Sequence, residues 1–263
     1  MPAKLLQNMT WEEFSEEVKQ DQVVILPVGS TEQHGGHLPV GTDTMVAIAL
    51  AEAASEKTGA VVAPPIWFGW SPHHMVLPGT ITVRPEVLIE LVYDVMESLA
   101  KHGCKRLVLI NGHRLVNIPW IQIACERARR QLGVQVVLFD PAYMSKEVVD
   151  RLGLGPLGHA EEIESSHMWH CHPEMYHADR AKDYVPGPTE LYSVDPRYQG
   201  DTLCYVPSTA EGMAKPVEVA NGTTGSPTKA CREKGKEYHE HLVARLVQVV
   251  EQLKPSTVTR CLS

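Results

Sequence analysis

Histidine and carboxylate side chains gather in one short segment near the N-terminus, EQHGGHLPVGTD. This segment begins with Glu32, carries His34 two residues later and ends on Asp43. Residues two apart in an extended chain point the same way, so Glu32 and His34 can face one site. Mixed imidazole and carboxylate ligands suit zinc, manganese or iron rather than calcium. The segment therefore predicts a metal site with these three residues as direct ligands.

A further histidine, His113, follows the β-branched run RLVLIN, just as Glu32 and His34 follow the run VVILPV. Open α/β sheets bind ligands at the carboxyl ends of their parallel strands, so two adjacent strands would bring these side chains together with Asp43. Taken singly, each histidine could be a hydrogen-bonded loop residue and Asp43 a helix cap. The combination of all four favours a metal site.

A third polar patch is the sequence GHAEEIESSHMWH. On a helix, Glu161 and Glu164 share one face, and His159 precedes that face in a loop. The alternative is a solvated acidic helix start, which the positive end of the helix dipole favours. The other histidines of this region are interpreted as surface or packing residues, because a histidine run without carboxylate partners is weak evidence for a metal: His167, His170, His172 and His177.

The loop WFGWSPHHMVLPGT also follows a strand pattern. Its aromatic and histidine residues, Trp67, Trp70, His73 and His74, could wall a pocket. Tryptophan is as often core filling, which is the alternative for both tryptophans. We take His74 as the candidate substrate-binding residue of this loop.

The elements that position these residues alternate between short β-branched runs and longer helical patterns, which is typical of a parallel sheet covered by helices. Strands are predicted at residues 23–28, 60–65, 106–111 and 134–140. A first helix is predicted to begin at a capping box formed by Thr10 and Glu13. Further helices are predicted at residues 42–57, 85–103, 117–132, 161–170 and 228–253. Right-handed crossovers between them predict a three-layer α/β/α sandwich with a mainly parallel sheet. Residues 184–216 are rich in proline and glycine and are expected to form a loop, an extra hairpin near the site or an oligomer contact.

Length and composition limit the function classes. The 263 residues, 43% of them hydrophobic, can bury a large core and fit one domain, 1–263. The formal net charge of −8 leaves no basic stripe for a phosphate backbone, which argues against nucleic acid as a partner. No stretch approaches ~18 uninterrupted apolar residues, so we expect a cytoplasmic protein without a membrane partner. The six cysteines stand singly and are expected to be reduced packing residues.

The motifs EQHGGHLPVGTD, HMVLPGT, NGH and GHAEEIESS, in this order and spacing, resemble those of the creatininase (creatinine amidohydrolase) family. The resemblance implies an α/β/α sandwich, a small-molecule substrate, two divalent metal ions (zinc and/or manganese, with iron as an option) and a homo-oligomer, usually a hexamer. It also implies which residues act. The family's ligand positions fall on Glu32, His34, Asp43, His113 and Glu164, with Asp43 bridging the two metals. The family's acid/base histidine falls on His159.

Departures from the family pattern bear on the substrate. Creatininase has tyrosine and a ligand glutamate directly after its NGH, where this chain has Arg114 and Leu115. Because Leu115 cannot coordinate, the second metal must rely on another residue, such as Glu164, or bind weakly. Gly155 and Pro156 stand where creatininase has a Trp-Asp pair, so the creatinine pocket is not reproduced. Arg114 replaces a glycine of the common family sequence NGHGGN, and a guanidinium there suggests an anionic or polyhydroxylated substrate.

The leading hypothesis is therefore hydrolysis of a non-peptide amide or cyclic amide C–N bond in a small molecule other than creatinine. Metals would activate the water, and His159 would protonate the leaving nitrogen. The alternative in the same fold is ring-opening hydrolysis of a cyclic ketone such as 3-dehydro-scyllo-inosose, since some family relatives are linked to inositol breakdown. Relatives that deformylate a nucleotide precursor or trim a peptide-derived cofactor leave two more options. A non-catalytic, metal-bound oligomeric binding protein is the option from another class, against which the retained His159 argues.

Overall fold

The computed structural model describes residues 1–187 and 208–255. Its centre is a five-stranded sheet in the order β1-β3-β2-β4-β5, in which every pair of neighbouring strands is parallel. The strands are β1 (Lys4–Leu5), β2 (Val24–Val28), β3 (Val61–Val62), β4 (Arg106–Asn111) and β5 (Gln135–Phe139). All five residues of the central strand β2 are buried. The carboxyl ends of β2 and β4 are therefore neighbours at one edge of the sheet.

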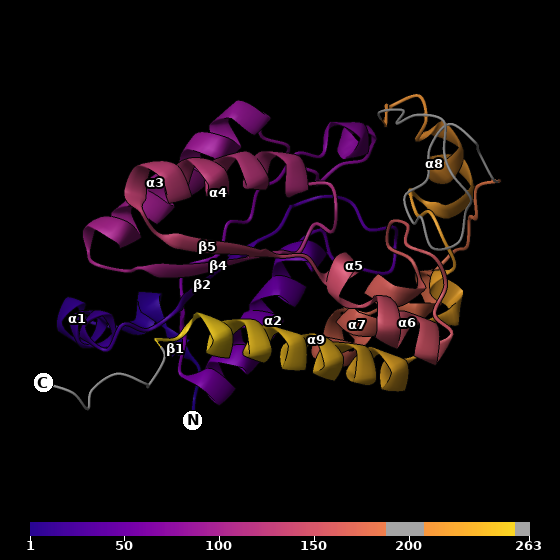
Figure 1. Ribbon diagram of the computed structural model, residues 1–263. Coiled ribbons are helices and arrows are strands. Elements are labelled where there is room, and N and C mark those ends of the chain that lie inside the picture. Colours follow the sequence, from indigo (N-terminus) through magenta and orange to yellow (C-terminus); the bar gives the residue numbers. More distant parts are fainter. Residues whose placement is uncertain (188–207, 256–263) are drawn as a thin grey trace, which may run out of the picture.

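Helices cover both faces of the sheet, as Figure 1 shows. The helices α3 (Pro85–Lys101) and α4 (Ile118–Leu132) pack on one face, and α2 (Thr42–Thr58) and α9 (Arg232–Leu253) on the other. Alternate residues of β2 divide between the two cores: Ile25 packs with α2 and α9, whereas Val24 and Leu26 pack with α3 and α4. This alternation is the two-residue period of a strand buried on both faces. The predicted three-layer α/β/α sandwich is confirmed.

The remaining helices are α1 (Trp11–Lys19), α5 (Pro141–Met144), α6 (Lys146–Leu152), α7 (Glu162–Cys171) and α8 (Ala214–Ala220). Short 3-10 turns lie at Leu6–Asn8, Pro72–Val76, Pro173–Met175, Ala178–Arg180 and Pro227–Lys229. The predicted capping box of α1 is present: the Thr10 backbone N–H donates to Glu13 Oε2 at 2.7 Å, and the Glu13 N–H donates to the Thr10 hydroxyl at 3.3 Å. Among the helices of the described ranges, none has the length and apolar character needed to span a bilayer.

Four element predictions need correction. The strand predicted at residues 60–65 forms only at Val61–Val62. The strand β1 was not predicted, because two residues are too few for a readable period. The last helix begins at Arg232 rather than at residue 228, since Pro227–Lys229 forms a 3-10 turn and Cys231 is extended. Most of the predicted loop at 184–216 lies outside the described residues, but its end is helical, because α8 begins at Ala214.

Two glycines fix the first turn of α2 against the sheet. A Cβ on Gly112, just after β4, would lie 2.0 Å from the carbonyl oxygen of Asp43. A Cβ on Gly29, just after β2, would lie 2.2 Å from the Thr44 hydroxyl oxygen. Only glycine allows backbones to approach this closely. The start of α2 is thus held over the ends of both central strands, which determines where Asp43 lies.

Candidate metal centre

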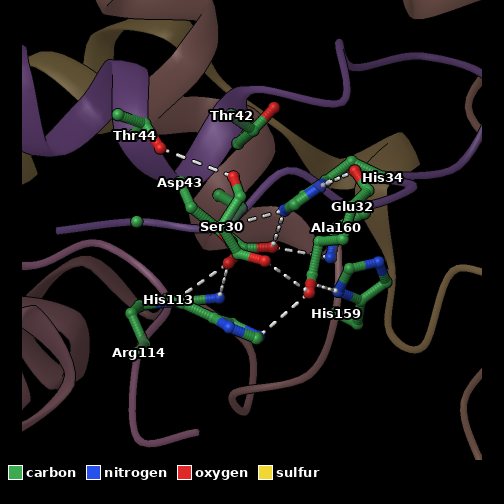
Figure 2. A network of polar contacts seen from close by, with 12 residues as sticks. Ser30, Glu32, His34, Thr42, Asp43, Thr44, His113, Arg114, His159 and Ala160 are labelled. Carbon is green, nitrogen blue, oxygen red and sulfur yellow. Dashed lines mark hydrogen bonds and ion pairs between the residues drawn. The ribbon is translucent and has the colours of Figure 1, made fainter. Parts of the chain in front are cut away.

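Ligand-type side chains from four segments converge beyond the carboxyl ends of β2 and β4 (Figure 2). Glu32 and His34 come from the loop after β2, Asp43 from the first turn of α2 and His113 from the turn after β4. Glu164 comes from the first turn of α7. The first four are fully or nearly buried, and the Glu164 side chain is 12% exposed. Residues that lie up to 132 positions apart thus form one buried polar cluster.

Three overlapping groups of ligand-type atoms lie in the cluster, one of them formed by Glu32, His34 and His159. The other two groups contain Asp43. One group is Glu32, Asp43 and His113, the other is His34, Asp43 and Glu164, and within each group the atoms lie within 4.8 Å of one another. His113 Nε2 lies 3.2 Å from Glu32 Oε2, and His34 Nε2 lies 3.2 Å from Asp43 Oδ1 and 3.8 Å from Glu164 Oε2. Asp43 belongs to both groups. This arrangement can hold two ions with one carboxylate between them.

The hydrogen bonding of the cluster is incomplete in a way that fits cations. Among the described residues, three ligand-type atoms of the cluster find no hydrogen-bond partner: Glu32 Oε1, His34 Nε2 and Asp43 Oδ2. His113 Nδ1 also finds none, but the nitrogen of that ring that faces Glu32 is Nε2. Buried polar atoms are nearly always satisfied in native proteins, and an ion would satisfy lone pairs that face one another. Nitrogen and carboxylate oxygen donors without sulfur match zinc or manganese. The residues present therefore fit a two-metal centre.

The charges of the cluster shift its histidine pKa values upward. Burial lowers the pKa of His34, but Asp43 and Glu164 outweigh burial and raise the pKa to about 10. Burial likewise opposes the charge of His113, whose pKa Glu32 and Asp43 raise to about 9. Without another cation in the cluster, both imidazoles are therefore protonated at neutral pH and paired with carboxylates.

The carboxylates of the cluster respond in two ways. Burial raises the pKa of Glu164, but Arg114 and His34 lower it to about 2. Burial also opposes the charge of Glu32, whose pKa lies well below its ordinary value because of nearby histidines, His113 first. For Asp43 burial prevails and the pKa is raised. Asp43 is thus the carboxylate that most needs a further positive charge.

His159 borders the cluster from the loop before α7. Its ring lies 4.5 Å from the ring of His34, and its Nδ1 lies 3.4 Å from Glu32 Oε1. Its Nε2 lies 2.5 Å from the carbonyl oxygen of Gln33. Because a carbonyl only accepts, Nε2 carries the hydrogen and the Nδ1 lone pair faces the cluster. Burial and the positive charge of His34 lower the pKa of His159 to about 4, so its imidazole is neutral at neutral pH and its Nδ1 is free to accept a proton.

His74 closes the same side of the cluster from the Pro72–Val76 turn. Its ring stacks on that of His159 at 4.0 Å, and the Gln33 side-chain amide donates to its Nδ1 at 2.8 Å. The other nitrogen, Nε2, therefore carries the hydrogen and points toward Glu32 Oε1, 3.5 Å away. Burial holds the pKa of His74 below its ordinary value. Gln33 thus orients both neutral histidines, through its carbonyl and its side chain.

Arg114 lies buried behind the cluster. Its Nη2 lies 2.9 Å from Glu161 Oε1 and 2.6 Å from Glu164 Oε1, and its Nε donates to Glu164 Oε1 at 3.1 Å. The backbone N–H of Ala160 donates to the other oxygen, Glu164 Oε2, at 2.6 Å. The guanidinium is therefore already paired with two carboxylates, and it fixes the orientation of the oxygen that faces His34.

All eight predicted site residues lie in this region, seven around one centre and Arg114 directly behind it. Leu115 has a left-handed backbone conformation (φ 63°), and its N–H donates to Asp140 Oδ2 at 2.9 Å. Sequence reasoning missed Gln33 and the pairing of Glu161. Gln33 lies inside the motif, but its type carries no ligand signal. Glu161 was considered only as a surface residue or a neighbour of Glu164 on a helix face, whereas it caps α7 and is buried.

A parallel α/β/α sandwich with a buried centre for two metals and a neutral histidine base beside it defines a metal-dependent hydrolase. Comparison with known proteins narrows this class. Residues 7–250 match the creatininase family, described as creatinine amidohydrolase. The chain therefore belongs to the creatininase family.

Two similar relatives differ in their reactions. A 3-dehydro-scyllo-inosose hydrolase of Thermotoga maritima is 32% identical, over 94% of this chain and 82% of that protein. A creatinine amidohydrolase of Pseudomonas putida is 30% identical, over 95% of this chain and 97% of that protein. The chain is therefore similar to enzymes that are named for different small-molecule substrates.

Solved structures support the same membership. A crystal structure of creatininase superposes with a TM-score of 0.82 at 30% identity, covering 97% of this chain and 99% of that one. A manganese form of creatininase and a zinc–zinc form of a creatininase variant each superpose with a TM-score of 0.80 at 29% identity; they cover 96% and 97% of this chain and 99% and 100% of theirs.

Proposed function

We propose that this protein is a two-metal hydrolase that cleaves an amide or cyclic amide C–N bond of a small molecule other than creatinine. The observation that carries the proposal is the shared Asp43 between two ligand groups, with the lone pair of a neutral His159 directed at them. Glu32, Asp43 and His113 would hold one zinc or manganese ion. His34, Asp43 and Glu164 would hold the second. When bound, such ions lower the pKa of a water and polarise a carbonyl group.

In this proposal Glu164 supplies the ligand that Leu115 cannot. Arg114 holds one oxygen of Glu164 and leaves the other directed toward His34. This pairing favours a positioning role for Arg114 over the substrate contact that the sequence suggests. The second metal position therefore depends on an Arg114–Glu164 pair rather than on the glutamate that follows NGH in creatininase.

His159 is assigned the proton transfers. Its Nδ1 takes a proton from the attacking water and delivers it to the leaving nitrogen, while the Gln33 carbonyl keeps the hydrogen of the ring on Nε2. His74 is assigned to substrate orientation, because its Nε2 hydrogen points into the centre and can donate to the oxygen of the reacting carbonyl. Both roles use neutral imidazoles, which agrees with the lowered pKa values of the two histidines.

The first experiment compares wild type with His159→Ala. We expect the variant to keep its zinc or manganese content, measured by plasma emission spectrometry, and to lose turnover by ~100-fold or more on a lactam or formamide substrate found by an amine-release screen. Loss of metal in this variant would show that His159 is a ligand, and full turnover would remove it from the chemistry.

The second candidate function is ring-opening C–C hydrolysis of a cyclic ketone. It is favoured by the 32% identity to the inosose hydrolase over 94% of this chain. The two functions differ in what is released, because amide hydrolysis yields an amine or ammonia and ring opening of a ketone yields a single carboxylic acid. Incubation of the metal-loaded protein with lactams, formamides and cyclic diketones, followed by amine and acid quantification, distinguishes them. A protein that loads metal but converts none of them would favour the binding-protein alternative.

The remaining expectations concern assembly and location. We propose a homo-oligomer, a hexamer by family resemblance, located in the cytoplasm and without membrane or nucleic-acid partners. Light scattering of the purified protein gives the mass of the assembly, and a monomeric mass would contradict this proposal.

A further inference from the structure

A second group of metal-ligand side chains lies between α7 and α9, outside the centre described above. His167 and Cys171 stand one helical turn apart on α7, and His239 faces them from α9. His167 Nε2 lies 2.9 Å from His239 Nδ1, and Cys171 Sγ lies 3.5 Å from the same nitrogen. All three ligand atoms lie within 4.8 Å of one another. The sequence analysis interpreted His167 as a surface or packing residue, because a histidine run without carboxylate partners is weak evidence for a metal; its partner His239 lies on α9, 72 positions away.

One of the two ligand separations matches that of a tetrahedral zinc site, and the other is shorter. Tetrahedral zinc has bonds of about 2.0–2.1 Å to nitrogen and about 2.3 Å to sulfur, which separates a nitrogen from a sulfur ligand by about 3.6 Å and two nitrogens by about 3.4 Å. The observed Cys171–His239 separation of 3.5 Å already agrees. The His167–His239 separation of 2.9 Å would widen by about 0.5 Å, which small rotations of the two rings supply.

The scaffold that holds these residues is rigid. A Cβ on Gly235 would lie 1.8 Å from the backbone oxygen of Ser166, so α7 and α9 touch through their backbones at this point. His167 directly follows Ser166, and His239 lies one turn beyond Gly235. The backbone N–H of Cys231 also donates to the Ser166 hydroxyl at 3.0 Å. The spacing of the two histidines is therefore set by a close helix contact rather than by flexible side chains.

We propose that His167, Cys171 and His239 form a second, structural metal site that takes a zinc-type ion and links α7 to α9. The fourth position falls to His170, whose ring lies 5.4 Å from that of His239, or to water. His167 is buried, while Cys171 and His239 are partly exposed, which leaves a path for the ion. Binding replaces the proton of the Cys171 thiol and the hydrogen bond between the histidines by bonds to the metal. Because α7 also presents Glu164, this ion would fix the helix that serves the first centre.

Burial supports neutral imidazoles at this site. It holds the pKa of His167 well below its ordinary value, and it lowers the pKa of His239 to about 4. Burial also raises the pKa of the Cys171 thiol to about 12, so the thiol keeps its proton until a metal displaces it. The alternative is a hydrogen-bonded packing cluster without an ion, and the two can be separated spectroscopically.

The test uses Co²⁺ as a probe on the manganese-loaded, full-length protein. Cobalt bound to thiolate absorbs in the near ultraviolet, and the ligands of the first centre contain no sulfur, so this band reports only the second site. We expect wild type to show the band. Cys171→Ser should lose the band and should bind about one cobalt ion fewer per chain than wild type. His239→Gln should weaken cobalt binding at this band by more than about tenfold. The matched control is Cys231→Ser, which removes a partly exposed thiol near the same helix contact and should leave the band unchanged.

A further variant separates this site from the first centre. Glu32→Gln removes a ligand of the first centre and should keep the near-ultraviolet band, because its residue lies in the other cluster. The proposal is overturned if saturating cobalt gives wild type no band, if the band persists in Cys171→Ser, or if Glu32→Gln abolishes it. The first of these outcomes would leave the three residues as a hydrogen-bonded packing cluster.

Discussion

Replacement of Arg114 by methionine tests how the second metal position is built. In wild type, this guanidinium lies 2.6 Å from Glu164 and 2.9 Å from Glu161, and the three side chains are 8%, 12% and 1% exposed. Arg114→Met keeps much of the packing volume but leaves two buried carboxylates without their cation. Removal of one partner from a buried ion pair costs about 3–5 kcal/mol. We therefore expect the free energy of unfolding of metal-stripped protein to fall by about this amount.

The assay is urea unfolding followed by circular dichroism, with and without zinc. The matched control is Arg151→Met, because Arg151 pairs with Glu237 at 2.8 Å on the surface, where both side chains are about half exposed; its loss should cost about 0–1 kcal/mol. The double variant Arg114→Met/Glu161→Gln should recover part of the loss, since it leaves one buried carboxylate fewer. If Arg114→Met costs no more than the Arg151 control, Arg114 does not hold Glu164 as the geometry indicates, and the reasoning fails.

Two further predictions concern protons and packing. Zinc binding to metal-stripped protein should release protons, because the pKa values of about 10 for His34 and about 9 for His113 keep both rings protonated at pH 7 and the metal takes them neutral. Affinity should then rise with pH by up to about a hundredfold per unit and level off above pH 9–10, as titration calorimetry in buffers of different ionisation enthalpy would measure; a pH-independent affinity would contradict this. Gly112→Ala should lower the unfolding free energy by at least about 1–3 kcal/mol and reduce metal content, because its Cβ would lie 2.0 Å from the Asp43 carbonyl. Gly133→Ala is the control, because its Cβ would meet open space. It adds the cost of a left-handed backbone position (φ 68°) that Gly112 does not have, so a larger loss in Gly112→Ala reports the clash with Asp43.

The sequence was informative where a regular hydrophobic pattern marks a strand and polar residues follow it directly. β2, β4, β5 and the helices around them could be predicted from continuous apolar runs next to glycine. The run at residues 60–65 was also recognised, although only Val61–Val62 pair in the sheet. The convergence of the polar side chains that follow β2 and β4 could be predicted from the rule for parallel sheets. The role of Arg114 could not be predicted from its type, because a guanidinium near metals can face a substrate or a carboxylate, and only burial distinguishes these environments.

Contacts between distant segments account for most of what the sequence did not reveal. Cys171 and His239 are separated by 68 positions and meet only because α7 packs on α9 at Gly235. A lone cysteine and a lone histidine carry no signal at that separation. Gln33 likewise gained its role from His74 and His159, which come from two other segments.

The close contact between Gly112 and the first turn of α2 distinguishes two kinds of position in this site, those fixed to the sheet and those carried by loops. The backbone of Asp43 packs directly against Gly112, the residue before His113, so the positions of these two side chains are tied to the sheet. His74, by contrast, is carried by a 3-10 turn outside the sheet. The loop that carries His74 can therefore change in sequence without moving the backbone that holds Asp43. Two relatives at 30–32% identity are named for different substrates, creatinine and 3-dehydro-scyllo-inosose, so one family serves more than one reaction.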